Sequence, residues 1–569
     1  MSSTIWSSQP RQTAQIKFSD GQVLEGPLNT TIEEFVKAGN FPHVPPAMAC
    51  LVNGQLRELT YHADRDLNVQ VLTLGDSEGM RVYRRSLSFL LIAVAHELFP
   101  EAKIVVEYGL NFGALYCEVE GHPPFTGAEL KQIGTRMREL VAADLPILKE
   151  RVPLAEVKTL FEARCADDKL RLLRARRKPY LTLYTLGDYR DYMHGYMVPS
   201  TGYLQTFAVD PYSEGFVLRY PRTHLPDRLQ PQLDYPKLVQ VFNEYGDWMS
   251  KLGIRDVGAL NGVVTQGNLL ETILVSEALQ EQRIAQIATL LASLHPRVRL
   301  VLISGPSSSG KTTFSKRLSI QLLAHGIQPY ALGLDDFLVE REDNPLDEDG
   351  DYDYENITAQ DLELFNHTLL ALMRGEAVTL PHYNFLTGQR EWGDTVSLSR
   401  EHIIIVEGIH GMNPELVPHI PSQAIFRIYV SALTQLNLDR HNRVATTDTR
   451  LLRRIIRDAS HRGYTAQDTI SRWPKVRRGE HKWIFPYQEH ADVMFNSALV
   501  YELAVIRPIA EPLLLQIEAG KPEHIEAKRL LSFLQWFEPC SPELVPDNSL
   551  LREFIGGSNL RDYKPTFNR

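Results

Sequence analysis

Apolar residues between positions 298 and 507 fall into short unbroken runs separated by segments with helical spacing. The runs at 300–303 and 403–406 contain only Leu, Ile and Val, which is typical of fully buried strands. Buried strands that alternate with helices indicate a parallel sheet covered by helices. We therefore predict a doubly wound α/β domain over residues 298–507.

Residues 14–75 show a different pattern, with short strands joined by Asp-Gly and Asn-Gly turns and one helix over 31–39. Thr30 or Thr31 is placed to cap the start of that helix, and Gly39 to close it. The pattern is β-grasp-like. It contains no nucleophile or metal cluster, so we interpret it as a binding or scaffolding module.

Residues 76–222 indicate a second unit of mixed α+β type. A strongly apolar helix is predicted over 86–100 and an amphipathic one over 125–147, with strands between them. Thr126 and Glu129 have the spacing of a capping box at the start of the second helix.

Residues 223–297 begin with regularly spaced prolines and continue as two helices, which predicts a helical connector. The second helix carries an apolar stripe that we expect to pack in a core or between domains: Leu270, Ile273, Leu274, Ala278, Ile284, Ile287 and Leu291. Residues 508–569 form a helical tail, which we expect to dock on the preceding domain. The predicted fold class is therefore a multidomain α/β protein.

The composition is ordinary for a globular protein, with 43% hydrophobic and 23% charged residues in 569. The net charge of −10 argues against a protein whose main role is to grip nucleic acid. The four cysteines are scattered, which favours reduced, buried thiols. No signal peptide and no apolar run of about 18 residues is present, so we expect a soluble cytoplasmic protein with no membrane contact. The oligomeric state stays open.

A phosphate-binding motif follows the first buried run, because GPSSSGKT at 305–312 fits GxxxxGK[ST] between a strand and a helix. In such a loop, consecutive backbone N–H groups and the helix N-terminus surround phosphate oxygens. Lys311 would reach the β- and γ-phosphates, and Thr312 would bind Mg²⁺. The alternative is a Gly/Ser-rich turn without a ligand, which the full pattern disfavours. The nucleotide-binding residues predicted are Gly305, Pro306, Ser307, Ser308, Ser309, Gly310, Lys311, Thr312 and Thr313.

Two acids stand at the ends of predicted strands, Asp335 after YALGL and Glu407 after HIIIV. Such positions adjoin the ligand site in doubly wound sheets, where a carboxylate can hold Mg²⁺ or accept a proton from an attacking hydroxyl. The alternative is that both are solvated loop acids. Residues 335–355 contain eleven acids and one base, Arg341, and we expect most of these acids to be solvated.

Residues 450–482 carry ten Arg or Lys against three acids. Several of the arginines share one face of a predicted helix. An arginine-rich lid that neutralises phosphoryl charge is one interpretation, RNA binding is the second, and a solvated surface helix is the third.

Residues 290–507 resemble the uridine kinase/phosphoribulokinase family in the strings ISGPSSSGKTTFSKRL, LDDFLVERE, PHYNF, IIIVEGIHG, RRIIRDASHRG and EHADVMFNSAL. The resemblance implies ATP as phosphoryl donor, Asp335 as catalytic base, and Mg²⁺ held by Thr312 and Glu407, with Asp335 as a further candidate ligand. It implies charge stabilisation by Lys311, Arg454, Arg457 and Arg462. It also implies acceptor contacts from Glu355, Tyr383 and Phe385.

The resemblance weakens at positions that read the acceptor. A family His corresponds to Gly388, a lid Arg to Tyr464, and a Gln to Arg472. Phosphoryl transfer to a small-molecule hydroxyl is therefore expected. The acceptor we favour is the 5′-hydroxyl of a nucleoside. A sugar or modified nucleoside is the alternative, because changed polar contacts change the substrate.

Most of residues 14–222 resemble the N-terminal half of threonyl-tRNA synthetases, a TGS domain followed by an editing-type domain, in strings such as HELFPEAK, PPFTGAEL and LYTLGDYRDYMHGYMVPSTGYL. The family's editing His and Cys positions hold Arg85, Phe89, Met193 and Met197 here. We therefore expect no editing activity from the remaining cleft, and a role in packing or in contact with RNA or protein. An ATP-switched RNA- or ribosome-associated regulator is the alternative function for the whole chain.

Overall fold

The computed structural model describes residues 11–39, 41, 45–384 and 387–565, and the chain divides into two compact units. The first unit comprises the chain up to Leu233 together with Asn437–Arg443 and Ile517–Arg529. The second unit comprises Asp234–Leu436, Val444–Gln516 and the chain from Leu530 onward.

The first unit begins with a five-stranded sheet in the order β2-β1-β5-β3-β4. Strands β1 and β5 are parallel, and the other neighbours are antiparallel. Helix α1, Ile32–Ala38, is capped by Thr31 and closed by Gly39, as predicted. The strands are β1 Thr13–Phe18, β2 Val23–Pro27, β3 Ala47–Val52, β4 Gln55–Arg57 and β5 Leu67–Thr73.

The rest of the first unit is mixed α and β. Helices α2, Ser77–Leu98, and α3, Gly127–Ala142, pack in one core with a four-stranded antiparallel sheet. The predicted capping box of Thr126 and Glu129 starts α3. The sheet contains β6 Lys103–Leu110, β7 Ala114–Glu120, β11 Ala208–Tyr212 and β12 Gly215–Arg219, and the smaller sheet β8 Leu148–Pro153, β9 Tyr180–Leu186 and β10 Tyr189–Asp191. The remaining helices are α4 Leu154–Ala163 and α5 Asp167–Leu172.

A buried network of charges fixes the segment Asn437–Arg443 in the first unit. The Lys169 ammonium, with a side chain only 4% exposed, lies 3.1 Å from Asp191 and 3.5 Å from Asp439. Arg440 pairs with Asp168 at 3.0 Å in the same region. Removing one partner of an ion pair this deeply buried would leave an unpaired buried charge, which is strongly destabilising.

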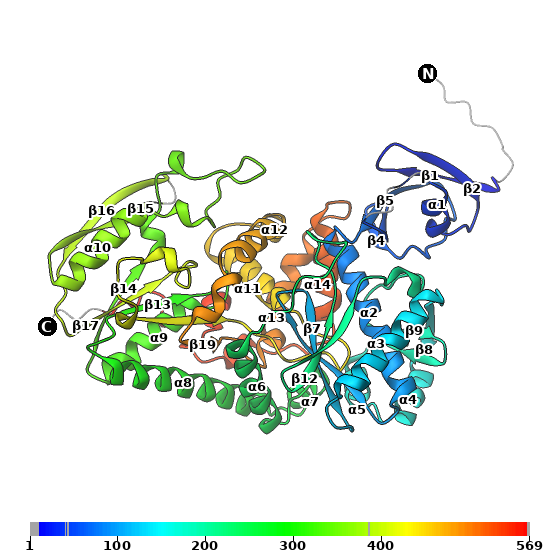
Figure 1. Ribbon diagram of the computed structural model, residues 1–569, viewed down its shortest axis with the longest axis horizontal. Coiled ribbons are helices and arrows are strands. Elements are labelled where there is room, and N and C mark those ends of the chain that lie inside the picture. Colours follow the sequence, from blue (N-terminus) through cyan, green and yellow to red (C-terminus); the bar gives the residue numbers. More distant parts are fainter. Residues whose placement is uncertain (1–10, 40, 42–44, 385–386, 566–569) are drawn as a thin grey trace, which may run out of the picture. The chain divides into compact units, whose positions relative to one another are not determined.

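The second unit is built on a five-stranded parallel sheet in the order β14-β17-β13-β18-β19 (Figure 1). Its strands are β13 Leu300–Ser304, β14 Gln328–Gly333, β17 His402–Glu407, β18 Ile425–Ser431 and β19 Val493–Asn496. Along β13, Val301 and Ile303 join one core cluster, whereas Leu300 and Leu302 join another. This alternation means that the sheet is covered on both faces, as the apolar runs predicted.

Helix α8, Leu269–Leu294, is one of the covering layers. Its residues Ile284, Ile287 and Leu291 pack in the same core cluster as β13 and helix α9, Lys311–Ala324. The helix therefore belongs to the second unit, although the proline spacing predicted a connector. The predicted apolar stripe is only partly buried, because the side chains of Leu270 and Leu274 are 47% and 53% exposed.

Helix α10, Leu362–Arg374, contributes to the core on the opposite face of the sheet. The antiparallel hairpin of β15, Val378–Asn384, and β16, Gln389–Val396, follows it in the chain. The other helices of the second unit are α6 Pro236–Lys251, α7 Val257–Thr265, α11 Thr446–His461, α12 Ala466–Trp483, α13 Glu502–Leu515 and α15 Arg552–Ile555. Helix α14, Glu523–Leu534, begins in the segment assigned to the first unit and ends in the second.

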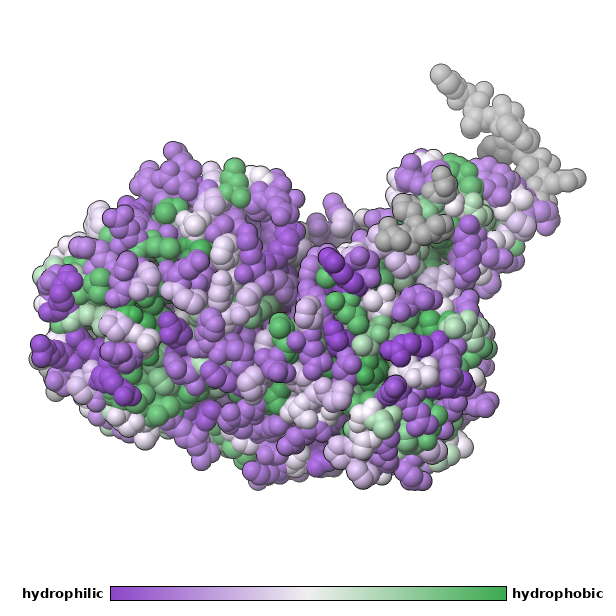
Figure 2. Space-filling model, in the orientation of Figure 1, coloured by the Kyte–Doolittle hydropathy of each residue, from purple (hydrophilic) through white to green (hydrophobic). Residues whose placement is uncertain are grey.

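Polar residues predominate on the face of the molecule that Figure 2 shows, and apolar residues appear there in separate patches. None of the helices in the described ranges is long and apolar enough to cross a membrane. Cys50, Cys117 and Cys540 are buried free thiols, as predicted, but Cys165 is exposed because it lies in the turn that follows α4.

Candidate functional site

The predicted phosphate-binding loop connects β13 to α9. Gly310 caps the start of α9 at φ +86°, a left-handed conformation that glycine adopts without steric cost. The first backbone N–H groups of a helix have no partner within the helix, so those of α9 can donate hydrogen bonds to an anion. The local geometry is therefore that of a phosphate cradle.

Lys311 and Thr312 stand at the start of α9. The Lys311 ammonium donates to the backbone carbonyls of Gly305 at 3.0 Å and Pro306 at 3.3 Å, within its own loop. Burial lowers the pKa of Lys311, and the nearby carboxylates, first Glu407, act in the opposite direction. The hydroxyl of Thr312 donates to the Glu407 carboxylate at 2.9 Å. The sheet thus brings together residues 95 positions apart, as the strand-end argument predicted.

Thr312 and Glu407 form a pair of oxygen donors that fits Mg²⁺. This ion is usually held by one or two protein carboxylates, with phosphate oxygens and waters completing its shell. Among the described residues, no group of three or more His, Cys, Asp and Glu could hold a metal ion. The donor set therefore fits an ion that arrives with a phosphate ligand.

Asp335 lies in the 3-10 turn Leu334–Phe337 that directly follows β14, one strand away from Glu407 in the sheet. Its side chain still reaches solvent, but surrounding protein atoms partly desolvate the carboxyl and raise its pKa. The Lys311 ammonium acts against this rise, which places the two side chains within electrostatic reach. A carboxylate that is accessible, close to the cradle and more basic than usual is suited to accept a proton.

The three predicted lid arginines surround one buried acid. Arg454, Arg457 and Arg462 lie 3.3, 3.4 and 3.5 Å from the carboxylate of Asp458, whose side chain is 3% exposed. Arg454 also donates to the hydroxyl of Ser307 in the phosphate-binding loop at 2.9 Å. Asp458 therefore orients the cluster, a role that sequence reasoning missed because it treated this acid only as a charge in a count.

Two other arginines of the same helix are structural. Arg450 is buried and pairs with Glu480, and Arg453 is buried and pairs with Glu502. Glu480 also accepts from the backbone N–H of Ser307 at 3.1 Å. The solvated-helix interpretation of residues 450–463 is therefore wrong, because the helix carries buried ion pairs as well as exposed charges.

Most acids of residues 335–355, the acidic loop, are exposed to solvent, as expected, but some of them also pair with cations of α12. Lys475 of α12 pairs with Asp351 and lies 3.1 Å from Asp347, and Arg478 lies 2.8 Å from Asp349. The basic segment and the acidic loop thus neutralise part of each other's charge. Fewer cations of residues 450–482 are therefore available for RNA than the ten Arg and Lys against three acids indicated.

Only some of the residues predicted to contact the phosphoryl acceptor lie near the phosphate-binding loop. Burial raises the pKa of Glu355 to about 7, and Arg454 and then Lys311 act against the rise, so Glu355 lies within electrostatic reach of both side chains. Tyr383 is 1% exposed and packs with Leu338 and Ala359, so its ring belongs to a small core rather than to an open surface. Phe385 lies outside the described residues.

Three positions depart from the family pattern, and Arg341 fills the space beside the first of them. A Cβ at Gly388 would lie 2.7 Å from Nε of Arg341. Tyr464 is exposed, and the guanidinium of Arg472 lies 4.2 Å from the centre of its ring.

A further carboxylate reaches the loop from the C-terminal tail. Glu553 of α15 accepts from the backbone N–H of Thr313 at 3.1 Å and from its hydroxyl at 2.8 Å. The tail had no chemical role in the sequence interpretation. No local signal could have identified Glu553, because it is 240 residues from Thr313 and lies in no motif.

The four positions of the predicted degenerate editing site are packed. Phe89, Met193 and Met197 belong to the main core of the first unit, with exposed fractions of 3% or less. Arg85 donates to the backbone carbonyl of Tyr196 at 2.6 Å. These side chains therefore fill space in the domain, which agrees with the expected role in packing.

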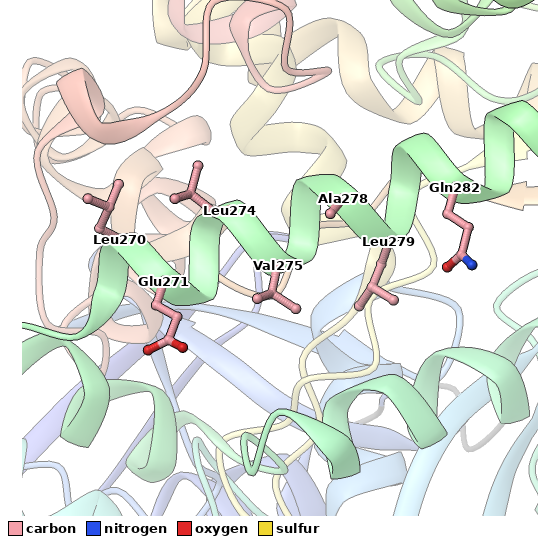
Figure 3. Close-up of a pocket in the computed structure, with 7 residues that line it drawn as sticks. All are labelled: Leu270, Glu271, Leu274, Val275, Ala278, Leu279 and Gln282. Carbon is pink, nitrogen blue, oxygen red and sulfur yellow. The ribbon is translucent and has the colours of Figure 1, made fainter.

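A pocket of about 620 Å³ lies along α8 (Figure 3). Its seven lining residues all come from that helix and include the exposed Leu270 and Leu274. None of them belongs to the phosphate-binding loop. The pocket is thus separate from the candidate site.

Residues 300–504 match the sequence model of the phosphoribulokinase / uridine kinase family. This segment contains the loop, both strand-end acids and the arginine cluster, but not Glu553. A solved structure described as a possible uridine kinase from Bacillus stearothermophilus is 23% identical, covering 38% of this chain and 98% of its own, with a TM-score of 0.27. The D-glycerate 3-kinase from Cryptococcus neoformans is 16% identical over 45% of this chain and 87% of its own, with a TM-score of 0.20.

The curated relatives matched by this chain include threonine–tRNA ligases. The protein from Symbiobacterium thermophilum is 32% identical over 195 residues, which are 34% of this chain and 30% of that protein. The protein from Acidithiobacillus ferrooxidans is 34% identical over 165 residues, 29% of this chain and 25% of that protein. The chain spans less than a third of the length of these relatives. The chain thus joins an N-terminal half similar to threonine–tRNA ligases to a segment, residues 300–504, that matches the phosphoribulokinase / uridine kinase family model.

Proposed function

We propose that this protein transfers the γ-phosphoryl group of ATP to the hydroxyl of a small molecule. The observation that carries the proposal is the meeting of the cradle residues Lys311 and Thr312 with the strand-end acid Glu407, beside Asp335. Phosphoryl transfer asks mainly for positioning and charge neutralisation, and these residues supply both. The family match of residues 300–504 supports the same reaction class.

In this proposal each side chain has one task. Asp335 accepts the proton of the acceptor hydroxyl. Lys311 and the three arginines around Asp458 balance the negative charge that develops on the transferred group. Mg²⁺, when bound, adds further positive charge at the phosphates. Thr312 and Glu407 would hold it.

The acceptor we propose first is a nucleoside 5′-hydroxyl, with Glu355 binding hydroxyl groups of the sugar. A different sugar or a modified nucleoside remains the competing acceptor, because Arg341 fills the space beside Gly388 and Tyr383 is buried. The test is ATP consumption over a panel of nucleosides and sugars with identification of the product. A phosphorylated nucleoside supports the first choice. A phosphorylated sugar supports the second choice. If no ATP-dependent product forms, both choices are contradicted.

A second proposal concerns the first unit, which we infer contacts RNA through a β-grasp TGS-like domain and an editing-like domain without hydrolytic activity. The similarity to threonine–tRNA ligases supports it, as does the strand order β2-β1-β5-β3-β4 with parallel β1 and β5. The test is binding of tRNA as a function of salt. Binding that weakens steeply with salt is the expected result. Absence of binding at low salt would contradict it.

A further inference from the structure

The carboxylate of Glu553 sits on the phosphate-binding loop, at the first turn of α9. One carboxylate oxygen accepts two hydrogen bonds from Thr313, from its backbone N–H at 3.1 Å and from its hydroxyl at 2.8 Å. The N–H groups at the start of the helix after such a loop are the ones that bind nucleotide phosphates. A protein carboxylate thus holds a group that a phosphate oxygen would need.

The other side-chain donors of the loop either lack a hydrogen-bond partner or bond to the loop's own backbone. Ser308 and Ser309 are 3% and 0% exposed, and their hydroxyls have no hydrogen-bond partner within the described part of the chain. The Lys311 ammonium is turned onto the carbonyls of Gly305 and Pro306. Buried donors without acceptors are costly, so these groups favour the arrival of an anion.

The short helix that carries Glu553 is firmly docked. Leu550, Leu551 and Phe554 are buried, and Leu550 belongs to the core cluster of β13 and α9. The Arg453 guanidinium lies 4.9 Å from the centre of the Phe554 ring. Lys316 of α9 donates to the backbone carbonyl of Leu560, 2.8 Å away. The backbone of α15 is therefore held in place, whereas the half-buried Glu553 side chain can change its torsion angles.

A phosphate group and the Glu553 carboxylate compete for the backbone N–H of Thr313. The backbone N–H offers a single hydrogen. Two anions in contact also repel each other, and the repulsion is stronger in a partly desolvated site than in water. Burial is the main cause of the raised pKa of Glu407, and the charge of the Glu553 carboxylate adds to it.

We propose that Glu553 is an internal competitor of the nucleotide phosphates. In the free protein its carboxylate occupies the Thr313 donors. A nucleotide binds only after the side chain has rotated away, while α15 stays docked. The tail therefore sets the nucleotide affinity of the proposed kinase, and the inference rests on that proposed function. Because the competition is for phosphate oxygens, it applies to any polyphosphate and not to the nucleoside part.

The test is calorimetric titration of the full-length protein with Mg·ATP, with magnesium tripolyphosphate and with adenosine. Three variants are compared with the unchanged protein: E553A, E553Q and the control E543Q, which alters an exposed glutamate of the same tail. E553A is expected to bind both polyphosphates about tenfold more tightly, a gain of about 1.4 kcal/mol. E553Q is expected to gain less, because its amide oxygen can still accept from Thr313. Adenosine binding and E543Q are expected to show no change.

Thermal unfolding of each variant is measured alongside the titrations. If E553A does not fold, the comparison is made with E553Q. Equal or weaker polyphosphate binding by a folded E553A or E553Q overturns the inference, while binding by the unchanged protein still supports the proposed function. An equal gain for adenosine also overturns it, because the effect would not be specific to phosphate. Failure of every folded protein to bind Mg·ATP or tripolyphosphate overturns the inference and the proposed function together.

Discussion

The hydroxyl oxygen of Thr312 lies 2.9 Å from one carboxylate oxygen of Glu407 and 3.1 Å from the other. Thr312 belongs to the first turn of α9, and Glu407 ends β17, the neighbour of β13 in the sheet. The parallel register of β13 and β17 pairs Ile303 with Glu407, which places this acid beside the loop that leaves β13. The pair therefore marks where we expect Mg²⁺ to bind.

Replacement of Glu407 by Gln tests this metal position. The amide keeps the size of the side chain and can still accept from Thr312, but it removes a charged oxygen ligand. We expect the Mg²⁺ concentration for half-maximal activity to rise by about tenfold or more. The measurement is a Mg²⁺ titration of ATP turnover. Glu415→Gln, at an exposed position just beyond β17, is the control, and a Mg²⁺ dependence equal to that control would contradict the assignment.

Replacement of Asp458 by Asn tests whether this residue positions the lid arginines. The substitution leaves three guanidinium groups without their shared carboxylate. We expect kcat to fall about tenfold, because charge stabilisation in the transition state depends on how these groups are aimed.

The separate readout is the dissociation constant for Mg·ATP, which should change less than about threefold. A loss that appears only as weaker binding, or only as lower thermal stability with kcat intact, would assign Asp458 a purely structural role. Glu348→Gln, in the exposed acidic loop, is the control.

The buried charge network of the first unit makes a prediction about stability. Replacing Lys169 by Met leaves Asp191 and Asp439 without their buried counter-charge. We expect the free energy of unfolding of this unit to fall by about 3–5 kcal/mol. Urea unfolding is followed against Lys158→Met, which alters an exposed lysine. A difference of less than about 1 kcal/mol between the two variants would show that the network contributes little.

The pH dependence of stability is predicted from Glu355, whose pKa burial raises to about 7 from an ordinary 4.5. Between these values the folded protein keeps a proton that the unfolded chain has lost. Folding is therefore favoured less as pH rises from about 4.5 through 7, and the change levels off above that. Glu355→Gln removes this contribution. The variant should therefore gain stability relative to the unchanged protein as pH rises across this window, in urea unfolding at each pH. A constant difference would contradict the raised pKa.

The parts of the site that the sequence predicted are those that depend on local order. The phosphate-binding loop needs only its own spacing between a strand and a helix, and the capping residues Thr31 and Thr126 act on their own first turns. Asp335 and Glu407 were predicted because ends of adjacent parallel strands meet at one edge of a sheet.

The parts that were missed depend on contacts between distant segments. Arg450 and Arg453 have the polar pattern of an exposed face, and only Glu480 and Glu502, 30 and 49 residues further on, make their burial possible. Glu553 is a single acid in an unremarkable tail. Leu270 and Leu274 fit an apolar stripe, and periodicity alone does not show that their part of the helix remains exposed.

The central claim is that this chain moves a phosphoryl group from ATP to a hydroxyl, with Asp335 as base. The most direct measurement is transfer of labelled γ-phosphate from ATP to a panel of nucleosides and sugars, for the unchanged protein and for Asp335→Asn. We predict a labelled phosphate ester with the unchanged protein. With the variant we predict a rate lower by about 10²–10⁴-fold, with Mg·ATP binding retained within a few fold. Transfer at an undiminished rate by Asp335→Asn, or no labelled ester with any acceptor, would contradict the account.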